Sequence, residues 1–200
     1  MPSPQIPMHL KVSEPSPWVI RWALLADHHG SILDLAAGNG RHGRLMLGLG
    51  CHVTFLDRDT VALRDLKEHP KAKVVEADLE DAIPWPLEGE TFDAIIVVNY
   101  LHRPLFDKII AALNPGGILI YETFALGNED YARPRNPDHL LKSGELLELV
   151  QGKLQVVGYE HGLIKSTDIP GVKQRLCAIN DLDLSVRDDG EPPAHEMSRV

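Results

Sequence analysis

The sequence predicts an α/β protein with a doubly wound, mostly parallel sheet of seven strands that ends in an antiparallel hairpin. Short apolar runs alternate with helical patterns along most of the chain. Five of these runs are apolar on both faces, which is typical of parallel strands covered by helices on either side. The last two runs are joined without a helix, which favours a hairpin at one edge. Ligands of such sheets bind outside the carboxyl ends of the strands.

The expected strands are residues 32–35, 52–57, 73–77, 93–98, 118–121, 155–159 and 174–179. The first helix is predicted from Ser16 and Pro17, an N-cap followed by proline at the first helical position. Its apolar face consists of Trp18, Trp22, Leu25 and Ala26. Further helices are expected over 41–49 and 59–68, between Pro104 and Pro115, and after Ser143 as a cap.

The chain of 200 residues fits one domain. Residues 1–15 contain four prolines and are expected to form a flexible arm, 16–181 the folded domain, and 182–200 a disordered acidic tail. Two cysteines are too few for a disulfide framework, so a reducing cytoplasm is expected. No apolar run is long enough to span a membrane. The net charge of −9 disfavours nucleic acid as a partner without excluding a local basic patch.

A glycine-rich loop, DLAAGNGRHG at residues 34–43, occupies the first strand-to-helix turn. Gly38 and Gly40 would let the backbone approach a ligand, and the helix N-terminus offers free N–H groups. Together with Gly43 they match G-x-G-x-x-G, and Asp57 follows at the distance of a ribose-binding acid. Taken alone, this pattern fits NAD as well as any other adenosine cofactor.

Two acidic residues separate these cofactors. Asp34 lies inside the first strand, where a carboxylate suits a cationic ammonium group better than a pyrophosphate. An isolated buried carboxylate is costly, so a purely structural role for Asp34 is hard to find. Asp78 ends the third strand, where it could accept a hydrogen bond from an adenine amino group. Asp57 and Asp78 could instead cap the segments that follow them.

The motifs DLAAGNGRHG, FLDRD, VVEADLED, ETFDAIIVV and LNPGGILIYETF occur in this order over about residues 30–125. In this they resemble the class I S-adenosylmethionine-dependent methyltransferases, and among these the small bacterial single-domain members that include the tellurite-resistance type. The resemblance implies a Rossmann-like methyltransferase fold and S-adenosylmethionine as the cofactor. The cofactor-binding residues that it implies are Asp34, Ala36, Gly38, Gly40, Asp57, Arg58, Asp78, Leu79 and Asn99.

In this resemblance, Asp34 and the glycine loop would hold the methionine part of the cofactor. Asp57 would bind both ribose hydroxyls, and Asp78 with Leu79 would frame the adenine. Asn99 follows the fourth strand and would face both the sulfonium and the methyl acceptor.

Residues that contact the acceptor must come from the strand ends and the loops beyond them. Asn99 and His102 are the candidate catalytic residues, and His102 is either a general base or a satisfied polar residue at a helix start. The candidate substrate residues are Tyr100, Arg103, Glu122, Tyr131, Arg133 and Arg135. The spacings H-E-x-x-H and Cys-x-x-Cys are absent from the sequence, so no metal site is expected.

The distribution of cations gives one expectation about the acceptor. If residues 161–173 form the loop of the hairpin, Lys165, Lys173 and Arg175 approach Arg103, Arg133 and Arg135. Six cations at the mouth of an acidic protein favour an anionic small molecule, although solvated loop charges explain them equally well. RNA or protein acceptors, a non-catalytic S-adenosylmethionine-binding module and an NAD-dependent oxidoreductase remain as alternatives.

Overall fold

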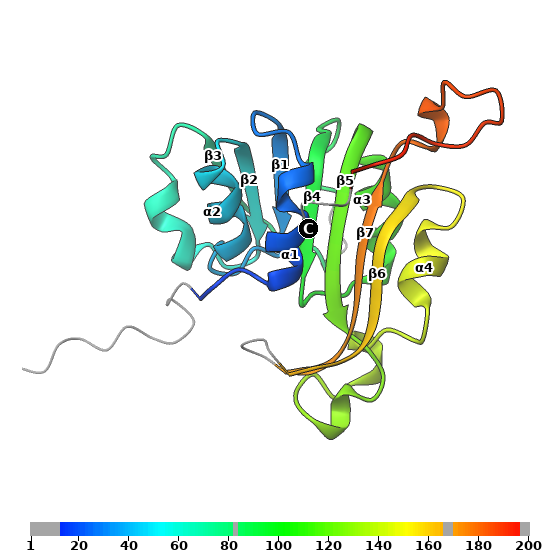
Figure 1. Ribbon diagram of the computed structural model, residues 1–200. Helices are drawn as coiled ribbons and strands as arrows, with labels where there is room; N and C mark the ends of the chain where they lie inside the picture. Colours follow the sequence, from blue (N-terminus) through cyan, green and yellow to red (C-terminus); the bar gives the residue numbers. More distant parts are fainter. Residues whose placement is uncertain (1–12, 82–83, 166–169, 197–200) are drawn as a thin grey trace, which may run out of the picture.

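The computed structural model describes residues 13–81, 84–165 and 170–196. Its strands form a sheet in the order β3-β2-β1-β4-β5-β7-β6 (Figure 1). The strands are β1 Ser31–Leu35, β2 His52–Asp57, β3 Ala72–Glu76, β4 Phe92–Val98, β5 Leu113–Phe124, β6 Gln155–Ile164 and β7 Gly171–Ile179. β1 to β5 pair in parallel, and β7 is antiparallel to both β5 and β6. The expected fold class and its terminal hairpin are therefore confirmed.

Helices cover both faces of the sheet, as Figure 1 shows. The α-helices are α1 Pro17–Trp22, α2 Arg41–Gly48, α3 Phe106–Ala111 and α4 Glu145–Val150. The short 3-10 helices are η2 Ala23–Leu25, η3 Val61–Leu66, η4 Arg103–Leu105, η5 Asn128–Asp130, η6 Pro137–His139 and η7 Leu182–Leu184. α1 and α2 pack on one face, and α3 and α4 on the other. No helix in the described part of the chain is long and apolar enough to cross a membrane.

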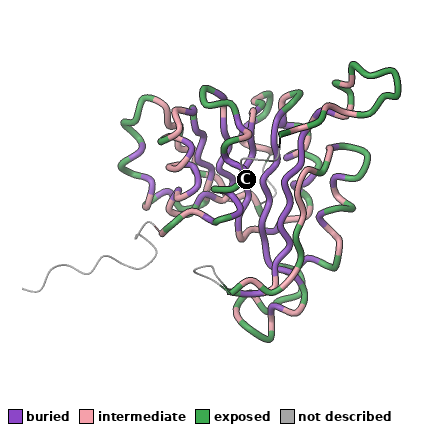
Figure 2. Tube along the Cα trace, in the orientation of Figure 1, coloured by how far each residue is buried: buried purple, intermediate pink, exposed green. Residues whose placement is uncertain are grey.

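The core is divided into two layers by the sheet, whose central strands are buried along most of their length (Figure 2). Neighbouring residues of a strand point to opposite faces. In β1, Leu33 and Leu35 therefore join the layer under α3 and α4, whereas Ile32 joins the layer under α1 and α2. Runs that are apolar at every position satisfy both layers, which is why they predicted covered strands.

The start of α1 forms as its sequence predicts. Ser16 Oγ accepts a hydrogen bond from the backbone N–H of Trp18 at 3.2 Å, and Pro17 occupies the first turn. Trp18 and Trp22 are buried, with ring centroids 5.5 Å apart in an edge-to-face arrangement. This capping places Ser16, and with it the start of the described chain, against the sheet.

Two helix predictions were wrong in detail. The segment expected as a helix over 59–68 forms only the 3-10 helix η3, because Asp57 and Asp59 accept hydrogen bonds from the backbone N–H groups two residues ahead. Such local bonds compete with an α-helical start. The cap of α4 is not Ser143 but Gly144, whose φ of 78° lies in the left-handed region that favours glycine.

Three strands extend by several residues beyond their predicted bounds. β5 begins at Leu113, so Pro115 lies within a strand instead of ending a helix. The two hairpin strands extend from 155 to 164 and from 171 to 179, and most of the predicted loop over 161–173 is therefore strand. Residues 166–169 of that loop lie outside the described residues. The predicted strand began at Gln174, so Lys173 was assigned to the loop although it lies in β7.

The structure describes only parts of the expected N-terminal arm and of the expected acidic tail. Residues 1–12 of the expected arm and 197–200 of the expected tail lie outside the described residues. Within the expected tail, Leu182–Leu184 form η7. His195 Nε2 lies 2.6 Å from a carboxylate oxygen of the buried Asp181, which joins the tail to the end of β7.

Candidate active site

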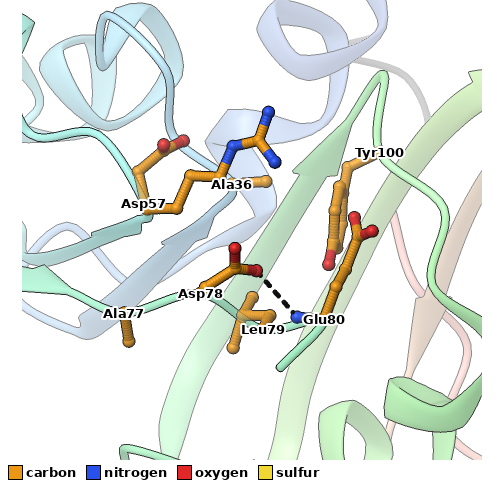
Figure 3. Close-up of a pocket in the computed structure, with 8 residues that line it drawn as sticks. Ala36, Asp57, Ala77, Asp78, Leu79, Glu80 and Tyr100 are labelled. Atoms are coloured by element: carbon orange, nitrogen blue, oxygen red, sulfur yellow. Dashed lines mark hydrogen bonds between the residues drawn. The ribbon is translucent and has the colours of Figure 1, made fainter. Parts of the chain in front are cut away.

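A pocket of about 180 Å³ lies beyond the carboxyl ends of four neighbouring strands, β1 to β4. Asp57 and Tyr100 approach it from opposite sides (Figure 3). The lining residues are Ala36, Asp57, Arg58, Ala77, Asp78, Leu79, Glu80 and Tyr100. Six of them were predicted from the sequence as site residues. Ala77 and Glu80 were missed, although their places directly before Asp78 and after Leu79 would have indicated them.

The backbone is strained where two central strands enter the site. Ala36 has φ 54° and Asn99 has φ 58°, the left-handed region that residues other than glycine rarely adopt. The two residues directly follow β1 and β4, which are neighbours in the sheet. Such strain persists where the surrounding structure imposes it, and it is concentrated at functional sites.

Asp57 connects the glycine loop to the end of β2. One carboxylate oxygen accepts a hydrogen bond from the backbone N–H of Gly38 at 2.7 Å. The other accepts from the N–H of Asp59 at 2.9 Å. Each oxygen retains lone-pair capacity for a further donor, and the half-buried side chain faces the pocket. Asp57 therefore orders the loop and presents two acceptors to a ligand.

The three glycines of the loop have different physical roles. A Cβ on Gly38 would have no heavy atom within 4 Å, so its left-handed turn faces open space. A Cβ on Gly40 would lie 2.7 Å from the Leu63 side chain, and one on Gly43 only 2.2 Å from the Phe55 ring. Gly40 and Gly43 are thus required for packing, and Gly38 is the glycine that leaves room for a ligand.

Asp34 has a structural partner that the sequence did not reveal. Its side chain is buried, and Oδ2 accepts a hydrogen bond from the backbone N–H of Gly43 at 2.8 Å. Gly43 lies in the first turn of α2, whose N-cap Gly40 offers no side chain, so Asp34 caps the helix from the sheet. Asp34 does not line the pocket. Its contact with a cofactor ammonium group remains a proposal.

Burial raises the pKa of Asp34 to about 7, from an ordinary value of 3.8. Between pH 4 and 7 the folded protein therefore holds a proton on Asp34 that the unfolded chain has lost. The contribution of this proton to the free energy of unfolding is complete below pH 4 and is lost as the pH rises through 7. We expect Asp34→Asn to gain stability relative to the parent protein over this window, by about 1 kcal/mol per pH unit. Urea unfolding of both proteins between pH 4 and 8.5 measures this difference.

The stability of Asp34→Asn must be compared with that of the parent protein at each pH, because His42 changes the stability of both proteins with pH in the opposite direction. Burial lowers its pKa to about 3, so its contribution to stability is present above pH 6.5 and is lost as the pH falls through 3. The two trends oppose each other in the parent protein. A stability difference between Asp34→Asn and the parent that is constant with pH would contradict the assignment of a proton to Asp34.

Asp78 and Tyr100 form the outer part of the pocket. Asp78 Oδ1 accepts a hydrogen bond from the backbone N–H of Glu80 at 2.9 Å, which holds the turn after β3 (Figure 3). The Tyr100 hydroxyl is buried and has no hydrogen-bond partner. Burial raises the pKa of Tyr100, so its phenol stays protonated. A neutral donor without a partner is thus available beside the pocket.

Several predicted substrate residues do not reach this pocket. Arg103 Nε and Nη2 donate to the Glu145 carboxylate at 2.6 and 3.0 Å, and the guanidinium also donates to the carbonyls of Asp138 and Leu140. These contacts join η4 to the start of α4 and to the segment before it. Tyr131, Arg133 and Arg135 are exposed between η5 and η6. His102 is half-buried before η4 and makes no capping hydrogen bond.

The assignment of Lys173 to the hairpin loop was wrong, and Arg175 does not reach the mouth of the site. Lys173 and Arg175 lie in β7 and are buried, and both contact Glu122 of β5. Lys173 Nζ donates to Glu122 Oε1 at 2.6 Å, and Arg175 Nε lies 3.1 Å from Oε2. Because a buried charge needs a partner, strand residues so placed are held by an ion pair and do not line an open mouth.

Comparison with known proteins assigns the central part of the chain. Residues 32–117 match the family model described as a methyltransferase domain. No curated protein sequence matches the chain. The matched residues run from β1 into β5 and include the glycine loop, Asp57, Asp78 and Asn99.

Solved structures agree with the fold. TehB from Haemophilus influenzae superposes with a TM-score of 0.65 at 19% identity, over 85% of this chain and 63% of that one. The chain thus spans less than two thirds of the TehB structure.

The Burkholderia thailandensis 1,6-didemethyltoxoflavin-N1-methyltransferase, crystallised with 1,6-didemethyltoxoflavin and S-adenosylhomocysteine, has a TM-score of 0.61 at 19% identity, covering 82% and 77% of the two chains. The N-methyltransferase NodS from Bradyrhizobium japonicum, complexed with S-adenosylhomocysteine, has a TM-score of 0.60 at 16% identity, covering 86% and 94%. The chain thus shares its fold with these solved methyltransferases, and its residues 32–117 match the methyltransferase domain family.

Proposed function

We propose that the chain transfers the methyl group of S-adenosylmethionine to a small molecule, and that the pocket at the ends of β1 to β4 holds the adenosine part of the cofactor. The observation that carries this proposal is the convergence of Asp57, Asp78 and Tyr100 on one pocket beside the open turn at Gly38. Adenosine presents two ribose hydroxyls, an adenine amino group and ring nitrogens. The pocket is lined by three carboxylates, those of Asp57, Asp78 and Glu80, and by the protonated phenol of Tyr100.

The residues present fit such a cofactor. Asp57 has acceptor capacity for both ribose hydroxyls, in addition to the bonds that order the loop. The side chains of Ala77 and Leu79 flank Asp78 with apolar surface, which suits a purine ring. The unpartnered hydroxyl of Tyr100 is a donor that a ligand nitrogen or oxygen would satisfy. The strained Ala36 would bring its backbone to the methionine part.

The cofactor supplies an electrophilic methyl group on a sulfonium, which passes to a nucleophile in line with the breaking bond. The task of the protein is then alignment and the exclusion of water. Asn99, next to the pocket residue Tyr100, would orient the reacting groups by its amide. His102 would accept a proton where the acceptor arrives protonated.

A small molecule is the acceptor class that we propose. The Burkholderia thailandensis enzyme of the same fold was crystallised with bound 1,6-didemethyltoxoflavin and S-adenosylhomocysteine. Of the six cations that favoured an anion, Lys173, Arg175 and Arg103 are engaged in ion pairs within the fold. The exposed Arg133, Arg135 and Lys165 remain as support, so anionic metabolites are the first class to screen. We place the activity in the cytoplasm, because both cysteines are free and buried.

The proposal is tested by incubating the protein with methyl-labelled S-adenosylmethionine and three separate fractions of a bacterial extract: metabolites below the filtration limit, RNA and protein. We expect label in the metabolite fraction only, and less of it with Asp57→Asn at a limiting concentration of the cofactor. Label confined to RNA or protein would overturn the acceptor class. Cofactor binding without transfer to any fraction would instead indicate a binding module.

A further inference from the structure

A buried ion pair lies beside Asn99 at the carboxyl edge of the sheet. Lys173 of β7 and Glu122 of β5 have side chains only 2% and 1% exposed, and the Nζ–Oε1 distance is 2.6 Å. The second oxygen of Glu122 accepts a hydrogen bond from Ser16 Oγ at 2.6 Å and lies 3.1 Å from Arg175 Nε. Desolvating such a pair is costly, and apolar residues of similar size often serve stability equally well. Stability alone therefore does not account for this pair, and the other contacts of Lys173 indicate a further role.

Lys173 Nζ has a second acceptor, the side-chain oxygen of Asn99, at 3.0 Å. The ammonium also lies 4.9 Å from the centre of the Phe124 ring, a cation–π contact. Glu122, Asn99 and Phe124 thus surround the ammonium, and the buried lysine has little freedom to leave them. The charge is fixed by strand positions, because Lys173 is paired in register with Phe124, two residues after Glu122.

Asn99 is held from both its backbone and its side chain. Its backbone N–H donates to the Glu122 carbonyl at 2.8 Å, and its φ of 58° keeps it in the left-handed region. The amide oxygen faces the ammonium of Lys173, which has only donors. Turning the amide over would direct the NH2 group at that ammonium, donor against donor. The lysine therefore permits one amide orientation, with the NH2 group directed away from it.

We propose that Lys173 is a positioning residue that fixes the carboxamide of Asn99 and so presents its NH2 group to the bound cofactor. Glu122 holds the lysine, and Ser16 and Arg175 hold Glu122. This inference rests on the proposed function, since it concerns the same site. It assigns a role to a lysine that lies 74 residues from Asn99 in sequence and does not line the pocket.

A double-mutant cycle tests the proposal, with S-adenosylhomocysteine as the ligand and calorimetric titration as the measurement. Lys173→Met is combined with Glu122→Gln, so that neither charge of this pair is left alone, and Arg175 keeps its ion pair with Glu160. We expect this pair variant and Asn99→Ala each to weaken binding about tenfold, the effect of one lost hydrogen bond. The triple variant is expected to bind no more weakly than Asn99→Ala, because the lysine acts through the asparagine. Lys73→Met with Glu90→Gln removes an exposed ion pair elsewhere and should leave binding unchanged.

Additive losses in the triple variant, or parent-like binding by the pair variant, would overturn the proposal. Nuclear magnetic resonance of asparagine-labelled protein provides the second readout, with the Asn99 side-chain signals assigned by their loss in Asn99→Ser. We expect these NH2 signals to shift on addition of S-adenosylhomocysteine to the parent protein. In the pair variant they should show averaged shifts before any ligand is added. Parent-like signals in the folded pair variant, or unshifted signals in the liganded parent, would contradict the positioning role.

The design separates two failures. If the parent protein does not bind S-adenosylhomocysteine, the proposed function fails, while the ligand-free spectra still test the contact between Lys173 and Asn99. If the pair variant does not fold, Asn99→Asp decides, since it can retain the contact with Lys173 but loses the NH2 donor. Affinity about tenfold below the parent supports the proposal, and parent-like affinity overturns it.

Discussion

Replacing Asp57 with alanine is expected to weaken S-adenosylhomocysteine binding by about 10- to 100-fold, the range for losing one or two hydrogen bonds to a charged group. The carboxylate accepts from Gly38 and Asp59 and faces the pocket, so its removal frees the loop and removes both acceptors for the ribose. Calorimetric titration measures the affinity, and thermal unfolding checks that the variant is folded.

Two further variants separate the contributions of Asp57. Asp57→Asn retains one oxygen for the Gly38 N–H and should bind better than Asp57→Ala but worse than the parent protein. Asp59→Ala changes the neighbouring exposed carboxylate, which does not line the pocket, and should leave affinity within about twofold. Parent-like affinity in Asp57→Ala would show that the ribose assignment is wrong.

Gly43→Ala is expected to destabilise the fold by about 1–3 kcal/mol or more. The added Cβ would lie 2.2 Å from the Phe55 ring in the tightly packed layer under α2. The glycine also carries the N–H that Asp34 accepts, so a displaced helix would strand a buried carboxylate. Urea unfolding of the parent and variant proteins measures the change in the free energy of unfolding.

Gly48 provides the matched control for this prediction. It lies in the same helix and is exposed, and a Cβ there would have no heavy atom within 4 Å. Gly48→Ala should therefore stabilise the protein slightly, by about 0.5–1 kcal/mol, because alanine loses less backbone entropy in a helix. The penalty of Gly43→Ala should shrink in a Phe55→Leu background, and an unchanged penalty there would rule out the clash as its cause.

The pocket was largely predictable because strand ends can be located from local pattern. Each apolar run predicts a strand, and the polar residue that follows it lies at the carboxyl edge. Asp57, Asp78 and Tyr100 meet this condition, and the structure brings them to one pocket. The order of the strands places these ends side by side, which no single motif could have shown.

The contacts of the buried acidic and basic residues could not be predicted, because they depend on how strands and helices pack against one another. Lys173 looked like a solvated loop cation until β7 placed it against Glu122, 51 residues away. Asp34 was interpreted only as a cofactor ligand, and its bond to the Gly43 N–H depends on how α2 rests on β1. The helix predicted over 59–68 does not form, because Asp57 and Asp59 accept local hydrogen bonds instead. Whether such bonds or an α-helix form depends on tertiary context.

The most direct test of the central claim is a crystal structure of the protein with S-adenosylhomocysteine. We predict the adenosine in the pocket of Asp57, Asp78 and Tyr100, with both ribose hydroxyls within hydrogen-bond distance of Asp57. The Asn99 amide should keep its oxygen on Lys173. A ligand bound elsewhere, or a ribose that does not contact Asp57, would contradict this account of the site.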